Sequence, residues 1–157
     1  MKKWWIPITM IAIFALYMIF SSSIATSPAE LVKSYEDEWG IKLPVPDKVE
    51  ELYSSGASFH GDGEWIHALS YEELDLEQTN LYECTDAIIG EVEGRVERFL
   101  SPIISREGES EAAAIAEKVS PETGDYYYRN SKNSDNDYLM ALYKPAQRIV
   151  YIFEWNQ

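Results

Sequence analysis

The stretch from Phe59 to His67 brings together side chains that could bind a ligand or do chemistry. Its sequence, FHGDGEWIH, places His60, Asp62, Glu64 and His67 close together. In an extended strand alternate side chains point to the same side, so the first three of these four would face the same way. We therefore treat these four residues as the candidate ligand-binding site.

The same stretch lacks the spacing of a metal site or a catalytic motif. It contains no HExxH sequence, no calcium-loop spacing and no cysteine, and Gly61 and Gly63 make the backbone irregular. Asp62 and Glu64 could act as acid and base, which would make the protein a small hydrolase or a metal-dependent enzyme. The alternative is structural: the glycines form a tight turn and His67 packs beside an aromatic neighbour. We expect the structural role, with no catalytic residue, no metal and no cofactor.

An apolar segment at the N-terminus determines on which side of a membrane this stretch is expected to lie. Lys2 and Lys3 precede an uncharged run over residues 4–20, which with the small residues that follow is long enough to cross a bilayer. The basic end is expected to stay in the cytoplasm. We predict that residues 1–26 are a transmembrane signal anchor at the cell membrane and residues 27–157 an extracytoplasmic domain. A cleaved signal peptide, which would release a secreted domain, is the alternative.

The charge of the exported part is one-sided. The chain has 13 basic and 27 acidic residues, and two of the basic ones are Lys2 and Lys3, so residues 28–157 carry 11 minus 27, or minus 16. Such a surface disfavours nucleic acid as a partner, so we expect none, and it favours a cationic protein or peptide; it also favours a soluble monomer. Cys84 is the single cysteine, so no intramolecular disulfide forms, and its apolar surroundings predict a buried thiol.

Local signals predict two helices before the candidate site. Ser27 and Glu30 form a capping box around Pro28, which predicts a helix over residues 28–39 that Gly40 ends. Residues 47–53 repeat the pattern of an acidic cap followed by a glutamate, which predicts a second, short helix.

Beyond the candidate site the hydrophobic period changes twice. Residues 65–71 alternate as in a strand that is covered on both faces. Helical periodicity then predicts a long helix over residues 76–100, ended by Ser101-Pro102, and a shorter one over residues 111–119. Strand signals return over residues 126–128 and in a terminal hairpin over residues 138–155, with its turn at residues 144–147. The sequence therefore predicts an α+β domain in which helices pack on an antiparallel sheet that ends in a C-terminal β-hairpin.

Three segments together resemble a family. These are FHGDGE at residues 59–64, GDYYYRN at residues 124–130 and NDYLMALY at residues 136–143. The sequence resembles uncharacterised small membrane-anchored extracytoplasmic proteins of Bacillus-like Gram-positive bacteria that share an FHGDGE-type motif. The resemblance implies an extracytoplasmic α+β domain behind one N-terminal anchor, and it transfers no catalytic residue.

These observations favour a non-catalytic role. We expect a membrane-tethered binding or immunity-like module whose acidic domain captures a cationic partner. Two other hypotheses remain: the enzyme centred on His60, Asp62 and Glu64, and a scaffold component of a larger envelope complex, which a large exposed apolar patch would indicate.

Overall fold

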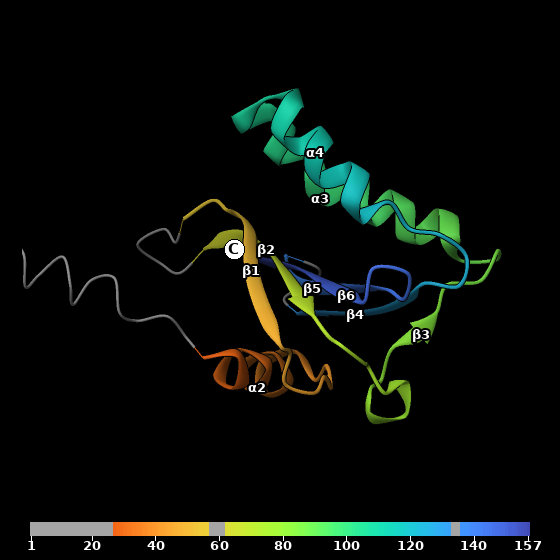
Figure 1. The fold of residues 1–157 in the computed structure, drawn as a ribbon. Coiled ribbons are helices and arrows are strands. Elements are labelled where there is room, and N and C mark those ends of the chain that lie inside the picture. Colours follow the sequence, from red (N-terminus) through yellow and green to blue (C-terminus); the bar gives the residue numbers. More distant parts are fainter. Residues whose placement is uncertain (1–26, 57–61, 133–135) are drawn as a thin grey trace, which may run out of the picture.

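An antiparallel sheet of six strands lies between helix α2 on one face and helices α3 and α4 on the other (Figure 1). This computed structural model describes residues 27–56, 62–132 and 136–157. The helices are α2 (Pro28–Trp39), α3 (Ile89–Glu107) and α4 (Glu109–Val119), with a 3-10 turn η1 (Leu76–Gln78). In their spatial order the strands are β1 (Lys48–Ser54), β2 (Gly63–Ser70), β6 (Ile149–Asn156), β5 (Asp137–Lys144), β4 (Tyr126–Lys132) and β3 (Tyr82–Glu83). The predicted α+β class with helices on an antiparallel sheet is confirmed.

The two strands at the centre of the sheet are buried on both faces. On one face, β5 and β6 contribute Leu142 and Phe153 to a core closed by α3 and α4. On the other face, the same strands contribute Leu139 and Ile152 to a core closed by α2. All four side chains are fully buried. Since neighbouring side chains on a strand point to opposite faces, a helix layer on each side is needed to cover them.

Helix α2 has the predicted boundaries, and its last residue fastens it to the sheet. The Ser27 and Glu30 side chains form the expected capping box, and Gly40 ends the helix with φ of 72°. The Trp39 indole nitrogen donates to Glu154 on β6 at 2.9 Å. The Trp39 carbonyl accepts hydrogen bonds from the Tyr128 hydroxyl at 2.6 Å and from the Asn130 side chain, and both residues lie on β4. The C-terminus of α2 is therefore tied to two separate strands.

The prediction of a short helix over residues 47–53 is wrong. These residues form the edge strand β1, which pairs with β2 and has a register shift between Glu51 and Tyr53. The shift turns the Tyr53 ring into the core on the α3 side. Asp47 does not cap a helix: its carboxylate accepts a hydrogen bond from the Glu72 backbone at 2.6 Å. Tertiary pairing has overridden the local capping signal.

The predicted helix over residues 76–100 is right only in its second half. Helix α3 begins at Ile89, because the preceding segment pairs with β4 and the backbone of Cys84 bonds to Gly124 and Asp125. The helix also continues through Pro102, where a stop was predicted. The fully buried Ile103 lies one turn beyond Phe99 in the same core, and this burial offsets the hydrogen bond that proline cannot donate.

The other predicted elements are found near their expected positions. Strand β2 alternates between the two cores, α4 covers the predicted residues 111–119, and β5 and β6 form the C-terminal hairpin. The hairpin turn spans residues 145–148. Within the ranges that the structure describes, no helix is long and apolar enough to cross a membrane. The predicted anchor, residues 1–26, lies outside those ranges.

Two glycines should respond oppositely to alanine. Gly94 lies inside α3, and a Cβ there would meet nothing within 4 Å, so Gly94→Ala should raise the free energy of unfolding by about 1 kcal/mol. Gly40 has φ of 72°, a conformation that disfavours alanine, so Gly40→Ala should lower it by about 1 kcal/mol. Urea unfolding of both variants measures these changes. A loss of stability in Gly94→Ala would contradict the helix position.

Candidate functional site

The structure places the predicted site residues on both faces of the sheet. Strand β2 directs Glu64 toward α3 and His67 toward α2. Asp62 stands just before the strand and lines the same groove as Glu64. His60 lies outside the residues that the structure describes. Asp62 and Glu64 are therefore brought together, whereas His67 is separated from them by the thickness of the sheet.

Glu64 is a buried carboxylate with a specific partner. Its side chain is 8% exposed and forms an ion pair with the guanidinium group of Arg106, near the end of α3. The two residues line an open groove of about 300 Å³ together with Asp62 and Trp155. A carboxylate paired in this way is oriented, so it can anchor a helix end or accept a hydrogen bond from a ligand.

Gly63 has no side chain, and this lets the start of β2 pass close to Trp65 and Gly56. A Cβ at this position would lie 2.6 Å from the Trp65 ring and 3.0 Å from the Gly56 carbonyl. Ser55 closes the other side, since its hydroxyl accepts a hydrogen bond from the Glu64 amide at 2.9 Å. The start of β2 is thus fixed by close packing. The rest of the predicted turn, at Gly61, lies outside the described residues.

His67 belongs to a separate polar cluster beneath α2. Its Nδ1 atom lies 2.8 Å from the Tyr35 hydroxyl, and its Nε2 atom lies 3.8 Å from the Glu51 carboxylate. Burial raises the pKa of Tyr35, so the hydroxyl keeps its proton and can donate it to Nδ1. This arrangement places the Nε2 proton toward Glu51. The cluster orients the ring and joins α2 to β1 and β2.

The described residues contain no group of three histidine, cysteine, aspartate or glutamate side chains that could hold a metal ion. In this part of the chain Cys84 is fully buried, and burial raises the pKa of its thiol to about 11. A thiol of this kind stays protonated near neutral pH and is a poor nucleophile.

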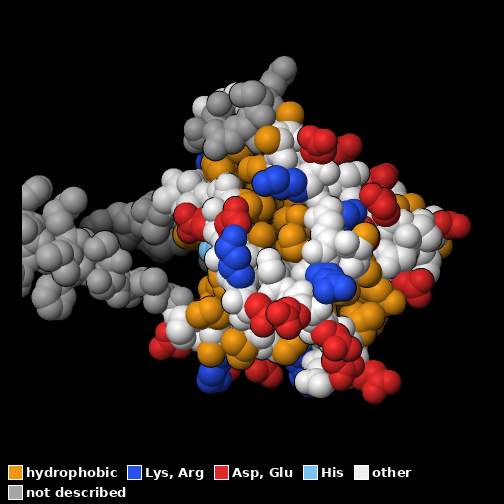
Figure 2. All heavy atoms as spheres, viewed as in Figure 1, with side chains coloured by type: hydrophobic (Ala, Val, Ile, Leu, Met, Phe, Trp, Pro, Cys, Tyr) orange, Lys and Arg blue, Asp and Glu red, His pale blue; other side chains and the backbone are white. Residues whose placement is uncertain are grey.

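A second feature is the segment from Glu72 to Asp86, which we call the acidic segment. No lysine or arginine occurs between Lys48 and Arg95. Six exposed carboxylates follow one another in the acidic segment: Glu72, Glu73, Asp75, Glu77, Glu83 and Asp86. Figure 2 shows acidic side chains gathered on the side of the molecule where η1 and β3 lie. None of the six forms an ion pair with another residue that the structure describes.

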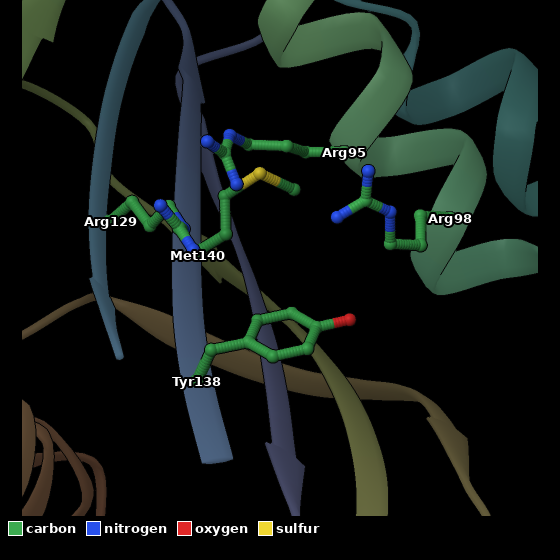
Figure 3. A pocket seen from close by; sticks show the side chains of 5 residues that line it. All are labelled: Arg95, Arg98, Arg129, Tyr138 and Met140. Atoms are coloured by element: carbon green, nitrogen blue, oxygen red, sulfur yellow. The ribbon is translucent and has the colours of Figure 1, made fainter. Parts of the chain in front are cut away.

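A third feature is a small cavity between α3 and the sheet with the opposite charge. Arg95 and Arg98 extend from α3 and Arg129 from β4, over Tyr138 and Met140 of β5 (Figure 3). The cavity has a volume of about 70 Å³. Its floor is apolar and its rim is cationic.

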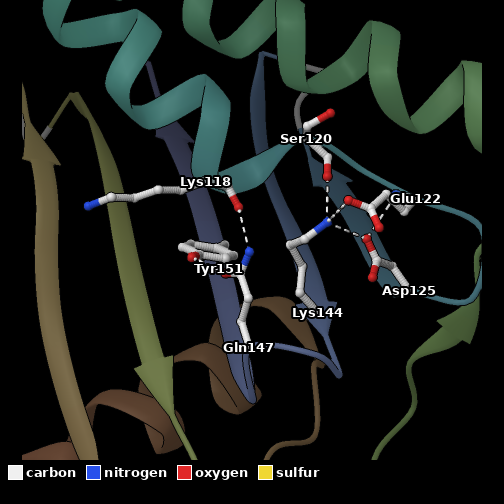
Figure 4. Close-up of polar contacts among 7 residues, drawn as sticks. All are labelled: Lys118, Ser120, Glu122, Asp125, Lys144, Gln147 and Tyr151. Atoms are coloured by element: carbon white, nitrogen blue, oxygen red, sulfur yellow. Dashed lines mark hydrogen bonds and ion pairs between the residues drawn. The ribbon is translucent and has the colours of Figure 1, made fainter.

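The buried charges at the end of β5 have a structural role. The Lys144 ammonium is 6% exposed and contacts the Asp125 carboxylate at 2.9 Å and the Ser120 carbonyl at 2.5 Å (Figure 4). Glu122 lies 3.5 Å away. Each donor faces an acceptor, so the network joins the hairpin to the connection between α4 and β4 without an unpaired charge.

Comparisons with known proteins gave no match: no protein-family model, no curated protein and no solved structure is similar to this chain.

Sequence reasoning missed the arginines that face the sheet. Arg106 pairs with a carboxylate 42 positions away, and Arg98 lies across a cavity from Arg129. The spacing of Arg95 and Arg98 places both on neighbouring positions of one helix surface, which is a usable signal. Their position opposite β4 depends on the packing of α3, and the sequence carries no local sign of it.

His67 should make stability depend on pH. Burial lowers the pKa of His67 below its ordinary value of 6.5, so the unfolded chain binds a proton there more readily than the folded protein does. The contribution of neutral His67 is therefore lost as the pH falls below about 6.5. We expect the urea midpoint of His67→Gln to fall less than that of the wild type between about pH 7 and about pH 5.

The matched control is His60→Gln, because the chain has only two histidines. If His67→Gln and the wild type have the same slope of stability against pH, the environment assigned to His67 is wrong.

Proposed function

We propose that the protein is a membrane-tethered extracytoplasmic binding module of the immunity-like kind, which captures a cationic protein or peptide and has no catalytic activity of its own. The observation that carries this proposal is the acidic segment, whose six exposed carboxylates form no ion pair with another residue that the structure describes. The tether is the apolar run over residues 4–20, behind Lys2 and Lys3. The resemblance to membrane-anchored proteins of Bacillus-like bacteria agrees with this placement.

An exposed aromatic ring beside the carboxylates adds a second element of recognition. Tyr82 on β3 is 62% exposed, and its ring lies 6.1 Å from that of Tyr127. Tyrosine is enriched in interfaces because it buries a large rigid area and keeps a polar end. A lysine or arginine of a partner could contact this ring face and a nearby carboxylate together.

Long-range electrostatics would give such a module fast and salt-dependent association. The charge of minus 16 on residues 28–157 attracts a cationic partner before contact, and exposed charges act over about 8 Å at physiological ionic strength. The same charge repels nucleic acid and other copies of the chain, so we propose that it acts as a monomer. The enzyme hypothesis would need His60, Asp62 and Glu64 to converge; Asp62 and Glu64 line one groove, in which Arg106 pairs with Glu64.

The acidic segment can be tested by exchanging carboxylates for amides of the same shape. In one variant Glu72, Glu73 and Glu77 become glutamine. In the control variant Glu36, Glu38 and Glu117, which are also exposed, become glutamine, so both variants gain the same charge. The probe is a fluorescent decalysine peptide titrated by anisotropy against the full chain in nonionic detergent.

We expect the first variant to bind the peptide about tenfold more weakly than the control at low salt, because its lost charges lie together. Wild-type affinity should fall steeply when salt is added. Equal affinities in the two variants would show that overall charge, and not the acidic segment, attracts the peptide. An affinity that does not change with salt would contradict the electrostatic basis of the proposal.

A further inference from the structure

An open groove runs between the C-terminal half of helix α3 and the sheet, past the ion pair of Glu64 and Arg106. Its floor is a row of three side chains, because Trp155 on β6 is in register with Glu64 on β2 and with Tyr138 on β5. Its wall is one ridge of α3, since residues four positions apart on a helix are neighbours. The ridge consists of Arg98, Pro102 and Arg106.

Two adjoining spaces make up this groove. The first, of about 300 Å³, lies around Glu64 and Arg106, and the second, of about 240 Å³, lies over Tyr138. Trp155 and Gln157 line both spaces, so the two meet at the indole ring. Together they reach the size of about 300 to 1,000 Å³ that is typical of small-molecule sites.

The aromatic part of the floor is held in place by packing. The rings of Tyr138 and Trp155 are nearly parallel, with centroids 6.0 Å apart and planes that differ by 14°. The fully buried Phe99 meets both rings edge-on, with its centroid 6.1 Å from each of theirs. Tyr138 and Trp155 themselves stay partly exposed. The groove therefore offers a preformed aromatic surface, which lowers the entropy cost of binding a rigid ligand.

Polar groups of both signs surround the aromatic rings. Among the described residues of the lining, Arg98 and Arg106 are basic. Asp62 and Glu64 are acidic, so these side chains carry no net formal charge, although the whole chain has a net charge of minus 14. Amide side chains, which both donate and accept hydrogen bonds, complete the rim; they belong to Asn136 and Gln157. Such a lining suits an uncharged ligand with many hydrogen-bonding groups.

We propose that this groove binds a neutral saccharide, with a sugar ring against Trp155 and with sugar hydroxyl groups bonded to the Glu64–Arg106 pair and the rim amides. A pyranose ring has apolar C–H faces that pack on aromatic rings, and its hydroxyl groups both donate and accept hydrogen bonds. Hydrogen bonds to charged side chains are the stronger ones, which suits the ion pair to this role.

The position of the floor favours a saccharide over a peptide. Extended peptides commonly add to an exposed edge of a sheet, whereas this floor lies on β2, β6 and β5, which are all inside the sheet. The site does not rest on the proposed function, since it uses no residue of the acidic segment and needs no cationic partner.

The experiment titrates the full chain with cellotriose and with chitotriose, two neutral chains of β-linked sugar rings. Sorbitol, which has hydroxyl groups but no ring, is the control ligand. The protein is kept in a polyoxyethylene detergent, because a detergent with a sugar head group would compete. The readout is the NMR signals of the indole and side-chain amide groups.

Saturable shifts are expected at Trp155, Asn136 and Gln157 with at least one trisaccharide and not with sorbitol. Two residues on the α2 side of the sheet should not shift. These are Trp39, in the core beneath α2, and Asn80, which bonds to Gly40 at the end of that helix.

Two variants with the same substitution test the role of the groove. Trp155→Leu keeps an apolar side chain but removes the aromatic surface, so it should weaken binding about tenfold. Trp65→Leu is the control, because Trp65 is also partly exposed but follows Glu64 on β2 and so points to the opposite face. Trp155→Phe, which keeps an aromatic ring, should retain most of the affinity. An unchanged Trp39 indole signal shows that each variant is folded.

Three results would overturn the proposal. Shifts that do not saturate, or that sorbitol reproduces, would show non-specific attraction of hydroxyl groups, and the wild type alone decides this. Saturable shifts at Trp39 and Asn80 without a shift at Trp155 would place the sugar elsewhere. Equal affinities of Trp155→Leu and Trp65→Leu would show that the aromatic floor does not bind it.

Discussion

Burial of the central strands on both faces is the constraint on which the rest of this structure depends. Strands β5 and β6 send side chains alternately into two cores, and these cores are closed by different helices. Neither face can be left to water without exposing Phe153 on one side or Ile152 on the other. Helix α2 and the pair α3 and α4 are therefore both required. Trp39 secures the thinner of the two helix layers through its bonds to β4 and β6.

The same alternation decides which polar groups can act together. Glu64 and His67 are close in sequence, but an odd separation on a strand puts them on opposite faces. Glu64 pairs with Arg106 on one face, and His67 bonds to Tyr35 on the other. The exposed carboxylates of the acidic segment lie at the periphery of the sheet, between β2 and α3. The arginine cavity is the converse: α3 places Arg95 and Arg98 over the sheet, and Arg95 pairs with Glu91 on the same helix.

Much of the fold follows from local signals in the sequence. The capping box at Ser27 and the terminal hairpin are encoded within a few residues, and both were predicted correctly. Residues 47–53 were not, because a cap-like pattern there competes with pairing to β2, and pairing depends on residues far away. Leu81 and Cys84 have helical spacing, yet they pack in different cores, so periodicity alone placed the start of α3 too early. The candidate site was predictable as a list of polar residues; its division across the sheet and its arginine partners depended on packing.

We propose that an apolar leader keeps this acidic domain on the outer side of the cell membrane, where it meets its partner. The most direct measurement is proteinase K treatment of intact cells that lack an outer membrane and produce the full chain, followed by detection of a C-terminal tag. We predict that the tag is removed from intact cells while a cytoplasmic control protein survives. If the tag survives in intact cells and is digested only after lysis, the domain is inside and the proposed function is contradicted.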